Sequence, residues 1–243
     1  MILTIDDLSV ARDGRDAVRG VSLALEPGTV TAVLGANGAG KSELVLGLAG
    51  MLPVTRGRVR LGKTDLTGRG PDAIRRAGVA AVPEGHRVLT RLSVDDNLRA
   101  AGSLLRDGLD TRLAETYALF PELAERKAQL AGTMSGGQQQ MLALGHALMS
   151  CPKFLLIDEM SLGLAPLIVK RLMGVVADLK ARGVGVLLIE QFTDMALAVS
   201  DQAVVLRGGV VRFSGRAETL VDNPERLDEA YFGVEAAKAP HLG

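Results

Sequence analysis

Aromatic residues and net charge are both scarce in this chain of 243 residues. Only 3% of its residues are aromatic, Trp is absent, and 28 Lys and Arg residues balance 28 Asp and Glu residues. A nucleic-acid-binding protein needs positive charge for the phosphates and often uses aromatic rings on which bases stack. The composition therefore argues against DNA or RNA as a partner.

The chain also has little cysteine and no long apolar run. Its single cysteine, Cys151, excludes an intrachain disulfide and fits a reducing compartment, and we expect a buried structural thiol there. The longest apolar runs, such as residues 186–189, fall far short of the roughly 20 residues of a membrane-spanning helix. Asp6 and Asp7 stand where a signal peptide would be apolar. We expect a cytosolic chain, unless a partner holds it at a membrane.

Short β-rich runs alternate with helical patterns along most of the sequence. The expected strands are residues 2–5, 21–25, 30–34, 59–61, 79–82, 154–157, 184–189 and 203–206. Apolar residues recur at helical spacing from Ile168 to Leu179, behind Pro166, which is well placed to begin a helix. Strands that alternate with helices of this length predict an α/β fold with a parallel sheet.

One stretch lacks strand patterns. From Ser93, a plausible N-cap, to about residue 149, apolar residues recur at helical spacing, with breaks near Gly108, Pro121 and Gly132. We interpret this stretch as a helical insertion in the sheet domain. Residues 236–243 are expected to form a loose tail.

A glycine-rich segment follows the expected strand at residues 30–34 and precedes a helical pattern. Its residues are Gly35, Ala36, Asn37, Gly38, Ala39, Gly40, Lys41 and Ser42. In a P-loop, the backbone N–H groups cradle phosphates at a helix N-terminus, the lysine adds positive charge and the serine hydroxyl binds Mg²⁺. A glycine-rich turn is the alternative, but by composition the four fixed positions would coincide in only roughly one sequence in a hundred. We therefore predict a phosphate-binding loop.

Two carboxylates end the buried strand at residues 154–157. Asp158 and Glu159 would point into the crevice at the carboxyl ends of parallel strands, where ligands bind. Such a pair by itself is more often a turn with solvated charges. Beside a P-loop, Asp158 is instead expected to hold Mg²⁺ and Glu159 to polarise an attacking water.

A third motif carries a family resemblance. Ser135, Gly136, Gly137 and Gln138 lie between the helical insertion and the strand at 154–157, and they resemble the LSGGQ signature of ATP-binding-cassette (ABC) ATPases. The resemblance covers essentially the whole chain. It implies that two cassettes sandwich two ATP molecules, with this signature facing the γ-phosphate on a second copy or on a companion ABC ATPase.

The resemblance also implies a fold and its boundaries. We expect a P-loop NTPase of the ABC ATPase type, with a mostly parallel sheet core, an N-terminal antiparallel β subdomain and a helical insertion. The whole chain, residues 1–243, would be one ABC ATPase domain. Its RecA-like core and β subdomain would occupy about residues 1–88 and 152–235, and its helical subdomain about residues 89–151.

Finer details resemble one branch of the family. Glu84 stands where most members carry the Q-loop glutamine, and Gln191 where the switch histidine is usual. This combination is similar to the second, LivF-type ATPase of branched-chain amino-acid uptake transporters. The resemblance implies ATP and Mg²⁺ as cofactors, with Glu84 a further candidate near the metal, and two membrane permease subunits and a solute-binding protein as partners. The chain would sit on the inner face of the cell membrane through the permease.

Several positions depart from the family pattern. Glu43 replaces the threonine that contacts the α-phosphate, and its repulsion with one phosphate charge at about 5 Å would approach ~3 kcal/mol at an effective dielectric constant of ~20. Arg12 stands where an aromatic residue usually stacks on adenine, and it is either a guanidinium platform or a solvated loop residue. Met160 and His146 are expected to be tolerated scaffold changes.

The predicted activity is ATP hydrolysis that powers an importer of branched-chain or other hydrophobic amino acids. Glu159 would be the general base, and Gln191 a neutral amide donor to the γ-phosphate. Two alternatives stay open. One is an ABC ATPase outside transport, although the chain has a single P-loop and no heptads. The other is a regulatory subunit that binds ATP and barely hydrolyses it, which Glu43, Met160 and Gln191 favour and Glu159 opposes.

Overall fold

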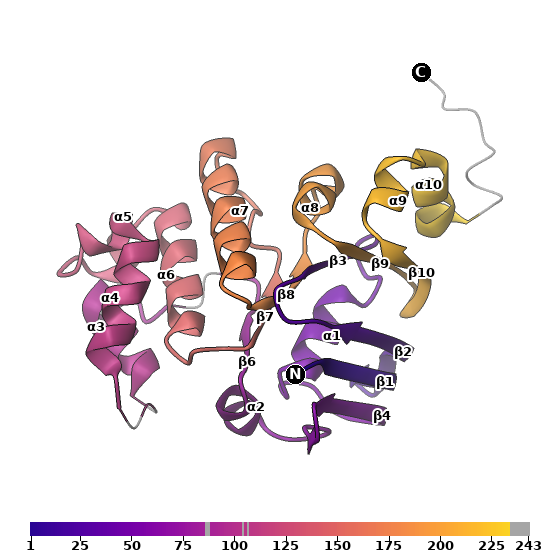
Figure 1. Cartoon of the computed structure of the whole chain (residues 1–243), viewed down its shortest axis with the longest axis horizontal. Coiled ribbons are helices and arrows are strands. Elements are labelled where there is room, and N and C mark those ends of the chain that lie inside the picture. The colour runs from indigo at the N-terminus through magenta and orange to yellow at the C-terminus, as the bar shows by residue number, and fades with distance from the viewer. Residues whose placement is uncertain (86–87, 104, 106, 234–243) are drawn as a thin grey trace.

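Two β-sheets and a block of helices make up the structure, a computed structural model that describes residues 1–85, 88–103, 105 and 107–233 (Figure 1). The first sheet is antiparallel, and its strands lie in the order β2 (Arg15–Leu25), β1 (Leu3–Arg12), β4 (Val54–Leu61) and β5 (Thr64–Asp65). The second contains, in order, β10 (Val210–Arg216), β9 (Gln202–Arg207), β3 (Val30–Leu34), β8 (Gly185–Ile189), β7 (Phe154–Asp158) and β6 (Val79–Val82).

The second sheet is parallel except at one edge. From β9 to β6 every neighbouring pair of strands is parallel, and β10 pairs with β9 in the antiparallel direction. The strands β3, β7 and β8 are buried along their whole length, as near-continuous apolar strands of a parallel sheet must be when both faces are covered. This sheet is the parallel α/β core that the sequence predicts.

Helices cover both faces of this core. Helix α1 (Lys41–Leu48) lies between the two sheets, where Leu44, Val45 and Leu48 pack into one apolar cluster with residues of β1 and β3. On the other face lie α7 (Pro166–Ala181) and α8 (Thr193–Val199), with α9 (Glu218–Val221) and α10 (Pro224–Phe232) beside β9 and β10 (Figure 1). The short helix α2 (Pro71–Ala77) precedes β6.

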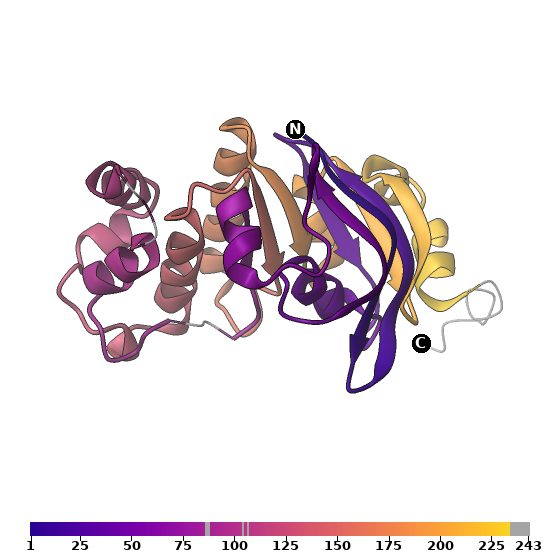
Figure 2. The same cartoon turned by 90° about the horizontal axis from the view of Figure 1, so that it is seen from below.

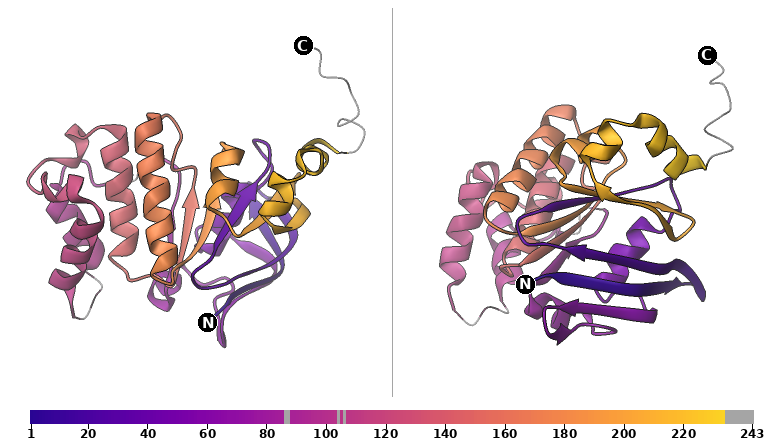
Figure 3. Two further views of the ribbon diagram at one scale, coloured as in Figure 1. Left: turned by 45° about the horizontal axis from the view of Figure 1, so that its top comes forward. Right: turned by 45° about the vertical axis from the view of Figure 1, so that its right-hand side comes forward.

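A group of helices occupies one end of the molecule, away from the antiparallel sheet (Figure 2). Its members are α3 (Val94–Gly102), α4 (Leu109–Leu119), α5 (Pro121–Ala124) and α6 (Gly136–Leu148). Ser93 caps α3, and its hydroxyl accepts a hydrogen bond from the backbone N–H of Asp96 at 3.1 Å, as the sequence indicates. All four helices lie within the predicted helical subdomain; its boundaries at residues 89 and 151 stay a prediction. The two views of Figure 3 place these helices beside α7 and opposite β1 and β2.

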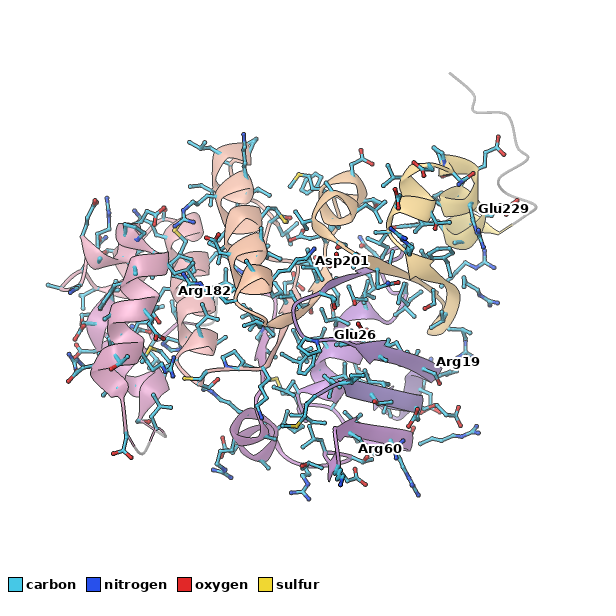
Figure 4. The ribbon with its side chains drawn as sticks, viewed as in Figure 1. Arg19, Glu26, Arg60, Arg182, Asp201 and Glu229 are labelled. Carbon is cyan, nitrogen blue, oxygen red and sulfur yellow. The ribbon has the colours of Figure 1, made fainter. Side chains whose placement is uncertain are left out.

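A half-buried ionic contact lies at the start of β3. The carboxylate of Asp201, labelled in Figure 4, accepts a hydrogen bond from the backbone N–H of Val30 at 2.9 Å. It also receives one from the Lys180 ammonium at 2.6 Å, and this contact holds the pKa of Asp201 below its usual value, against the effect of burial. The end of α7 and the start of β3 are therefore joined through one side chain.

Some sequence predictions are wrong or incomplete. Cys151 is exposed at the turn between α6 and β7, so the expected buried thiol is not found. The strands β5 and β10 were not predicted, because their apolar residues are few or mixed with polar ones. The strands β1 and β2 extend to 10 and 11 residues, far beyond the short runs expected, because cross-strand pairing holds polar residues such as Asp6 and Arg15 in extended backbone. The predicted tail, residues 236–243, lies outside the described residues.

A testable prediction follows from the close packing of α1 on β1. A Cβ atom at Gly47 would lie 2.5 Å from a methyl group of Val10, which is itself fully buried. We expect Gly47→Ala to lower the free energy of unfolding by about 1–3 kcal/mol, since a well-packed core does not accept an extra methyl without strain. Urea unfolding followed by circular dichroism measures this.

Gly174→Ala is the matched control, because a Cβ atom at Gly174 in α7 would meet nothing within 4 Å. There the same substitution should raise stability by up to about 1 kcal/mol through helix propensity. Equal shifts in the two variants would contradict the close approach at Gly47.

Candidate functional site

The glycine-rich loop joins β3 to α1 and is held by backbone contacts on two sides. A Cβ atom at Gly35 would lie 2.3 Å from the carbonyl oxygen of Leu206, and one at Gly40 would lie 2.7 Å from that of Ala17. Gly40 also has a φ of +100°, a left-handed conformation that favours glycine. The loop conformation therefore requires glycine at both positions, and the amides at the start of α1 are free of side-chain caps.

The Lys41 side chain folds back into this loop. Its ammonium group donates hydrogen bonds to the carbonyl oxygens of Gly35 at 2.7 Å and Ala36 at 3.1 Å, and the residue is only 5% exposed. Burial lowers the pKa of Lys41, whereas the nearby carboxylates of Glu159 and Asp158 act in the opposite direction. A charged ammonium held among carbonyls can transfer its hydrogen bonds to phosphate oxygens that enter the loop.

Ser42 and Asp158 meet across the end of the sheet. The Ser42 hydroxyl donates a hydrogen bond to Oδ1 of Asp158 at 3.1 Å. The pKa of Asp158 is raised to about 6, chiefly by burial and also by the carboxylates of Glu159 and Glu84, whereas the Ser42 hydrogen bond acts in the opposite direction. A divalent cation would reduce the electrostatic repulsion between this buried carboxylate and the other negative groups.

The donor set at this point fits Mg²⁺. A hydroxyl and a carboxylate are hard oxygen ligands, and Mg²⁺ in nucleotide sites takes few protein ligands and completes its shell with phosphates and water. Among the described residues, no group of three or more His, Cys, Asp or Glu side chains could hold a metal on its own. Glu84 is exposed on the loop after β6 and is linked to Asp158 only through its charge.

Glu159 and Gln191 contact each other directly. The Gln191 amide donates a hydrogen bond to Oε2 of Glu159 at 3.1 Å. Glu159 has a φ of +48°, and its backbone N–H bonds the carbonyl oxygen of Ile189 at 3.0 Å. A strained backbone at a non-glycine residue is common where a side chain must be aimed at a ligand. The structure thus brings the two predicted catalytic side chains together where β7 and β8 end.

A buried carboxylate that sequence reasoning missed lies one residue before Gln191. Glu190 is 2% exposed; its Oε2 receives a hydrogen bond from the Ser161 hydroxyl, and its Oε1 has no partner among the described residues. Burial raises the pKa of Glu190 to about 7, against the Ser161 bond. The only signal in the sequence is a carboxylate directly after the apolar strand at residues 184–189. Met160, between Glu159 and Ser161, is fully buried.

Arg12 and Glu43, predicted as separate departures, form an ion pair. Nη1 of Arg12 lies 2.7 Å from Oε1 of Glu43, with side-chain exposures of 53% and 17%. The hydrogen bond and charge of Glu43 raise the pKa of Arg12. Arg12 is therefore anchored to α1 rather than free in a loop.

The signature residues lie apart from the phosphate loop of their own chain. Ser135 caps α6, and a capping box joins its hydroxyl to the backbone of Gln138 and the Gln138 side chain to the backbone of Ser135. Gly136 and Gly137 form the first turn, where the backbone amides have no partner within the helix. The hydrogen bonds of the described residues do not join this motif to the loop at residues 35–42, and Figure 1 shows α6 and α1 on opposite sides of the parallel sheet.

Known proteins resemble this chain over most of its length. The family model of the ABC transporter matches residues 18–161, more than half of the chain. The high-affinity branched-chain amino acid transport ATP-binding protein BraG of Pseudomonas aeruginosa is 41% identical over 233 residues, which cover 96% of this chain and 100% of that protein. A probable branched-chain amino acid transport ATP-binding protein, LivF of Archaeoglobus fulgidus, is 34% identical and covers 86% of this chain and 89% of its own length.

A solved structure shares the architecture. The ADP conformation of MJ1267, an ATP-binding cassette of an ABC transporter, superimposes with a TM-score of 0.81 at 27% identity, covering 96% of this chain and 98% of that one. The predicted fold class is confirmed. The chain belongs to the ATP-binding proteins of ABC transporters. It is accordingly an ATP-binding ATPase subunit of such a transporter, and among the described residues no helix has the length and apolar character needed to cross a membrane.

The buried Glu190 carboxyl makes a prediction about pH. Its folded pKa of about 7 exceeds the ordinary value of 4.5, so the folded state keeps a proton that the unfolded chain releases. Its contribution to stability therefore falls as pH rises from about 4.5 to about 7, by roughly 2–3 kcal/mol. Glu190→Gln should remove that fall. Measured by urea unfolding, the free energy of unfolding of the variant minus that of the wild type should increase by about 2 kcal/mol between pH 5 and pH 8.

Glu26→Gln is the control for this measurement, since Glu26 is an exposed carboxylate of the same kind (Figure 4). It should leave the difference from the wild type constant across the same pH range. A constant difference for Glu190→Gln as well would show that this carboxyl does not hold its proton in the folded state.

Proposed function

We propose that this chain hydrolyses ATP to power an importer of branched-chain or other hydrophobic amino acids. The main support is the 41% identity to BraG over the full length of that protein, and the match to LivF points to the same class of solute. Gln191 in the switch position is a feature of the same branch of the family. The cassette itself would not contact the solute.

In the proposed reaction, water attacks the γ-phosphate in line with the leaving ADP. The phosphates lie in the loop at residues 35–42, and Lys41 transfers its hydrogen bonds from the loop carbonyls to phosphate oxygens. Ser42 and Asp158 would hold Mg²⁺, which neutralises charge on the phosphates when bound. Glu159 accepts the proton of the attacking water, and the Gln191 amide orients this carboxylate or donates to the γ-phosphate.

A second cassette would complete each site. The Ser135 hydroxyl and the amides at the start of α6 offer donors to an anion, yet they belong to a different part of this chain from its own phosphate loop. We infer that they serve the nucleotide on an opposing cassette, either a second copy or a companion ABC ATPase.

The permease would dock at a cleft beside the group of helices α3 to α6. This cleft has a volume of about 190 Å³ and lies between α2, β6 and α6, next to the loop that carries Glu84. Its lining includes Met51, Pro83, Ala143 and His146. The Nε2 atom of His146 is buried there without a hydrogen-bond partner among the described residues. A cytoplasmic helix of the permease with an apolar face fits this lining and would hold the chain at the inner face of the membrane, with a solute-binding protein on the other side.

One observation favours a second candidate, a nucleotide-binding subunit with weak hydrolysis. The Gln191 amide engages the Glu159 carboxylate, and a neutral amide cannot take up and return a proton as histidine can. The presence of Glu159 within reach of the phosphate loop favours hydrolysis. The turnover number decides between the two.

Two substitutions separate binding from chemistry. Glu159→Gln should reduce ATP hydrolysis at least about 100-fold while ATP still binds, since it removes the base and keeps the shape. Lys41→Ala should weaken ATP binding itself by about tenfold or more, because a buried positive charge at the phosphates is lost. A fluorescent-nucleotide titration and a phosphate-release assay measure both. Normal turnover in Glu159→Gln would rule out its role as the base.

Reconstitution tests the transport function. The chain, its permease and a companion ATPase in liposomes should take up radiolabelled leucine in an ATP-dependent way when the binding protein is added. Met51→Arg, which places a charge in the cleft, should abolish uptake and co-purification with the permease while the isolated chain still binds ATP. Val221→Arg on α9 is the control, since Val221 is 56% exposed outside the cleft. ATP-dependent uptake of an unrelated solute alone would overturn the proposed solute class.

A further inference from the structure

The ion pair between Arg12 and Glu43 joins two parts of the molecule at the edge of the phosphate loop. Arg12 is the last residue of β1, and Glu43 lies in the first turn of α1, directly after Lys41 and Ser42. Their side chains meet at 2.7 Å, although 31 residues separate them in sequence.

Backbone contacts fix the position of this pair relative to the loop. The N–H of Arg19 in β2 donates to the carbonyl of Gly209 at 2.8 Å, and the N–H of Gly209 donates to the carbonyl of Ala39 at 2.9 Å. The carbonyl of Ala17 lies against Gly40. The β1–β2 hairpin, which carries Arg12, is therefore anchored to the loop. Glu43 is held in place by α1, the helix that directly follows the loop.

The charges at this edge explain why the pair matters for a nucleotide. Glu43 is only 17% exposed and follows Ser42 in the first turn of α1. Burial lowers the pKa of the Lys41 ammonium in the loop, and the negative charge of Glu43 reaches this group and has the smaller, opposite effect. Without a partner, such a carboxylate would repel a triphosphate. The Arg12 guanidinium cancels that charge, because it bonds the carboxylate directly.

We propose that Arg12 and Glu43 act as one charge-compensated unit that sets the affinity of the loop for phosphate groups, with Arg12 neutralising Glu43. This inference rests on the proposed function, in that a nucleotide must bind at the phosphate loop. Arg12 contributes by its charge at the phosphate end and not by stacking on the base. All seven aromatic residues of the chain lie at or beyond Tyr117, so the hairpin offers no ring for the base either. Affinity then depends on the phosphates and little on the base.

The test compares two ligands, ATP and inorganic tripolyphosphate, which has the phosphates without the base. Arg12→Ala should weaken binding of both by a similar factor of about tenfold. This is the size expected of one uncompensated charge roughly 10 Å from a phosphate charge at an effective dielectric constant of about 20, and the limiting approach of about 5 Å would give a larger loss. Adding Glu43→Thr to Arg12→Ala should bring both affinities back to within about threefold of the wild type. Glu43→Thr alone should bind both ligands as tightly as the wild type or more tightly.

Arg15→Ala is the matched control. Arg15 is exposed on the same hairpin, so its substitution by alanine removes one positive charge and leaves the ion pair between Arg12 and Glu43 in place. It should change either affinity by less than about threefold. Circular dichroism shows whether each variant is folded.

Several results would overturn the proposal. A loss confined to ATP would identify Arg12 as a stacking platform. A double variant as weak as Arg12→Ala would show that Glu43 is not the source of the penalty, and an equal loss in Arg15→Ala would show that any charge on the hairpin acts alike. In each case the wild type still binds ATP and Lys41→Ala still weakens it, so the proposed function stands. A wild type that binds neither ligand would overturn both.

Discussion

A buried ammonium group determines how the centre of this molecule is built. The Lys41 side chain needs carbonyl partners inside the loop, and it finds them in Gly35 and Ala36 because the loop turns back over the start of α1. That turn brings Gly35 against β9 and Gly40 against β2, so strands of both sheets must reach the same point. The position of α1 between the two sheets follows from this arrangement. The antiparallel sheet therefore helps to hold the glycine-rich loop in place.

Three carboxylates near the ends of β7 and β8 differ in partner and therefore in chemistry. Asp158 faces the Ser42 hydroxyl, Glu159 faces the Gln191 amide, and Glu190 faces the Ser161 hydroxyl inside the protein. Burial favours a proton on Asp158 and on Glu190, whose pKa values rise to about 6 and about 7. Carboxylates at the ends of two neighbouring strands thus have different surroundings, which suit the proposed roles of cation ligand, proton acceptor and internal hydrogen-bonding group.

Local signals in the sequence predicted the parts of the structure that depend on local physics. The glycine-rich loop between a strand and a helix, the buried strand β7 and the Ser93 cap each follow from residue types at fixed spacing, and the structure has all three. The pairing of Arg12 with Glu43 could not be predicted, because it depends on how the hairpin crosses α1. The environment of Glu190 was missed for the same reason, since its partner Ser161 lies 29 residues away. Cys151 was misjudged because composition gives an average tendency for cysteine, whereas a turn with a φ of +50° exposes this one.

The exposed position of Cys151 makes it a natural place for a spectroscopic label. It is the only cysteine of the chain, and it lies in the turn between α6, which carries the signature motif, and β7, which carries Asp158. A thiol-reactive dye would therefore attach at one site without any engineered substitution. Any rotation of helices α3 to α6 against the parallel sheet would change the surroundings of that dye. Its fluorescence could therefore report such a rotation when ATP binds and when it is hydrolysed.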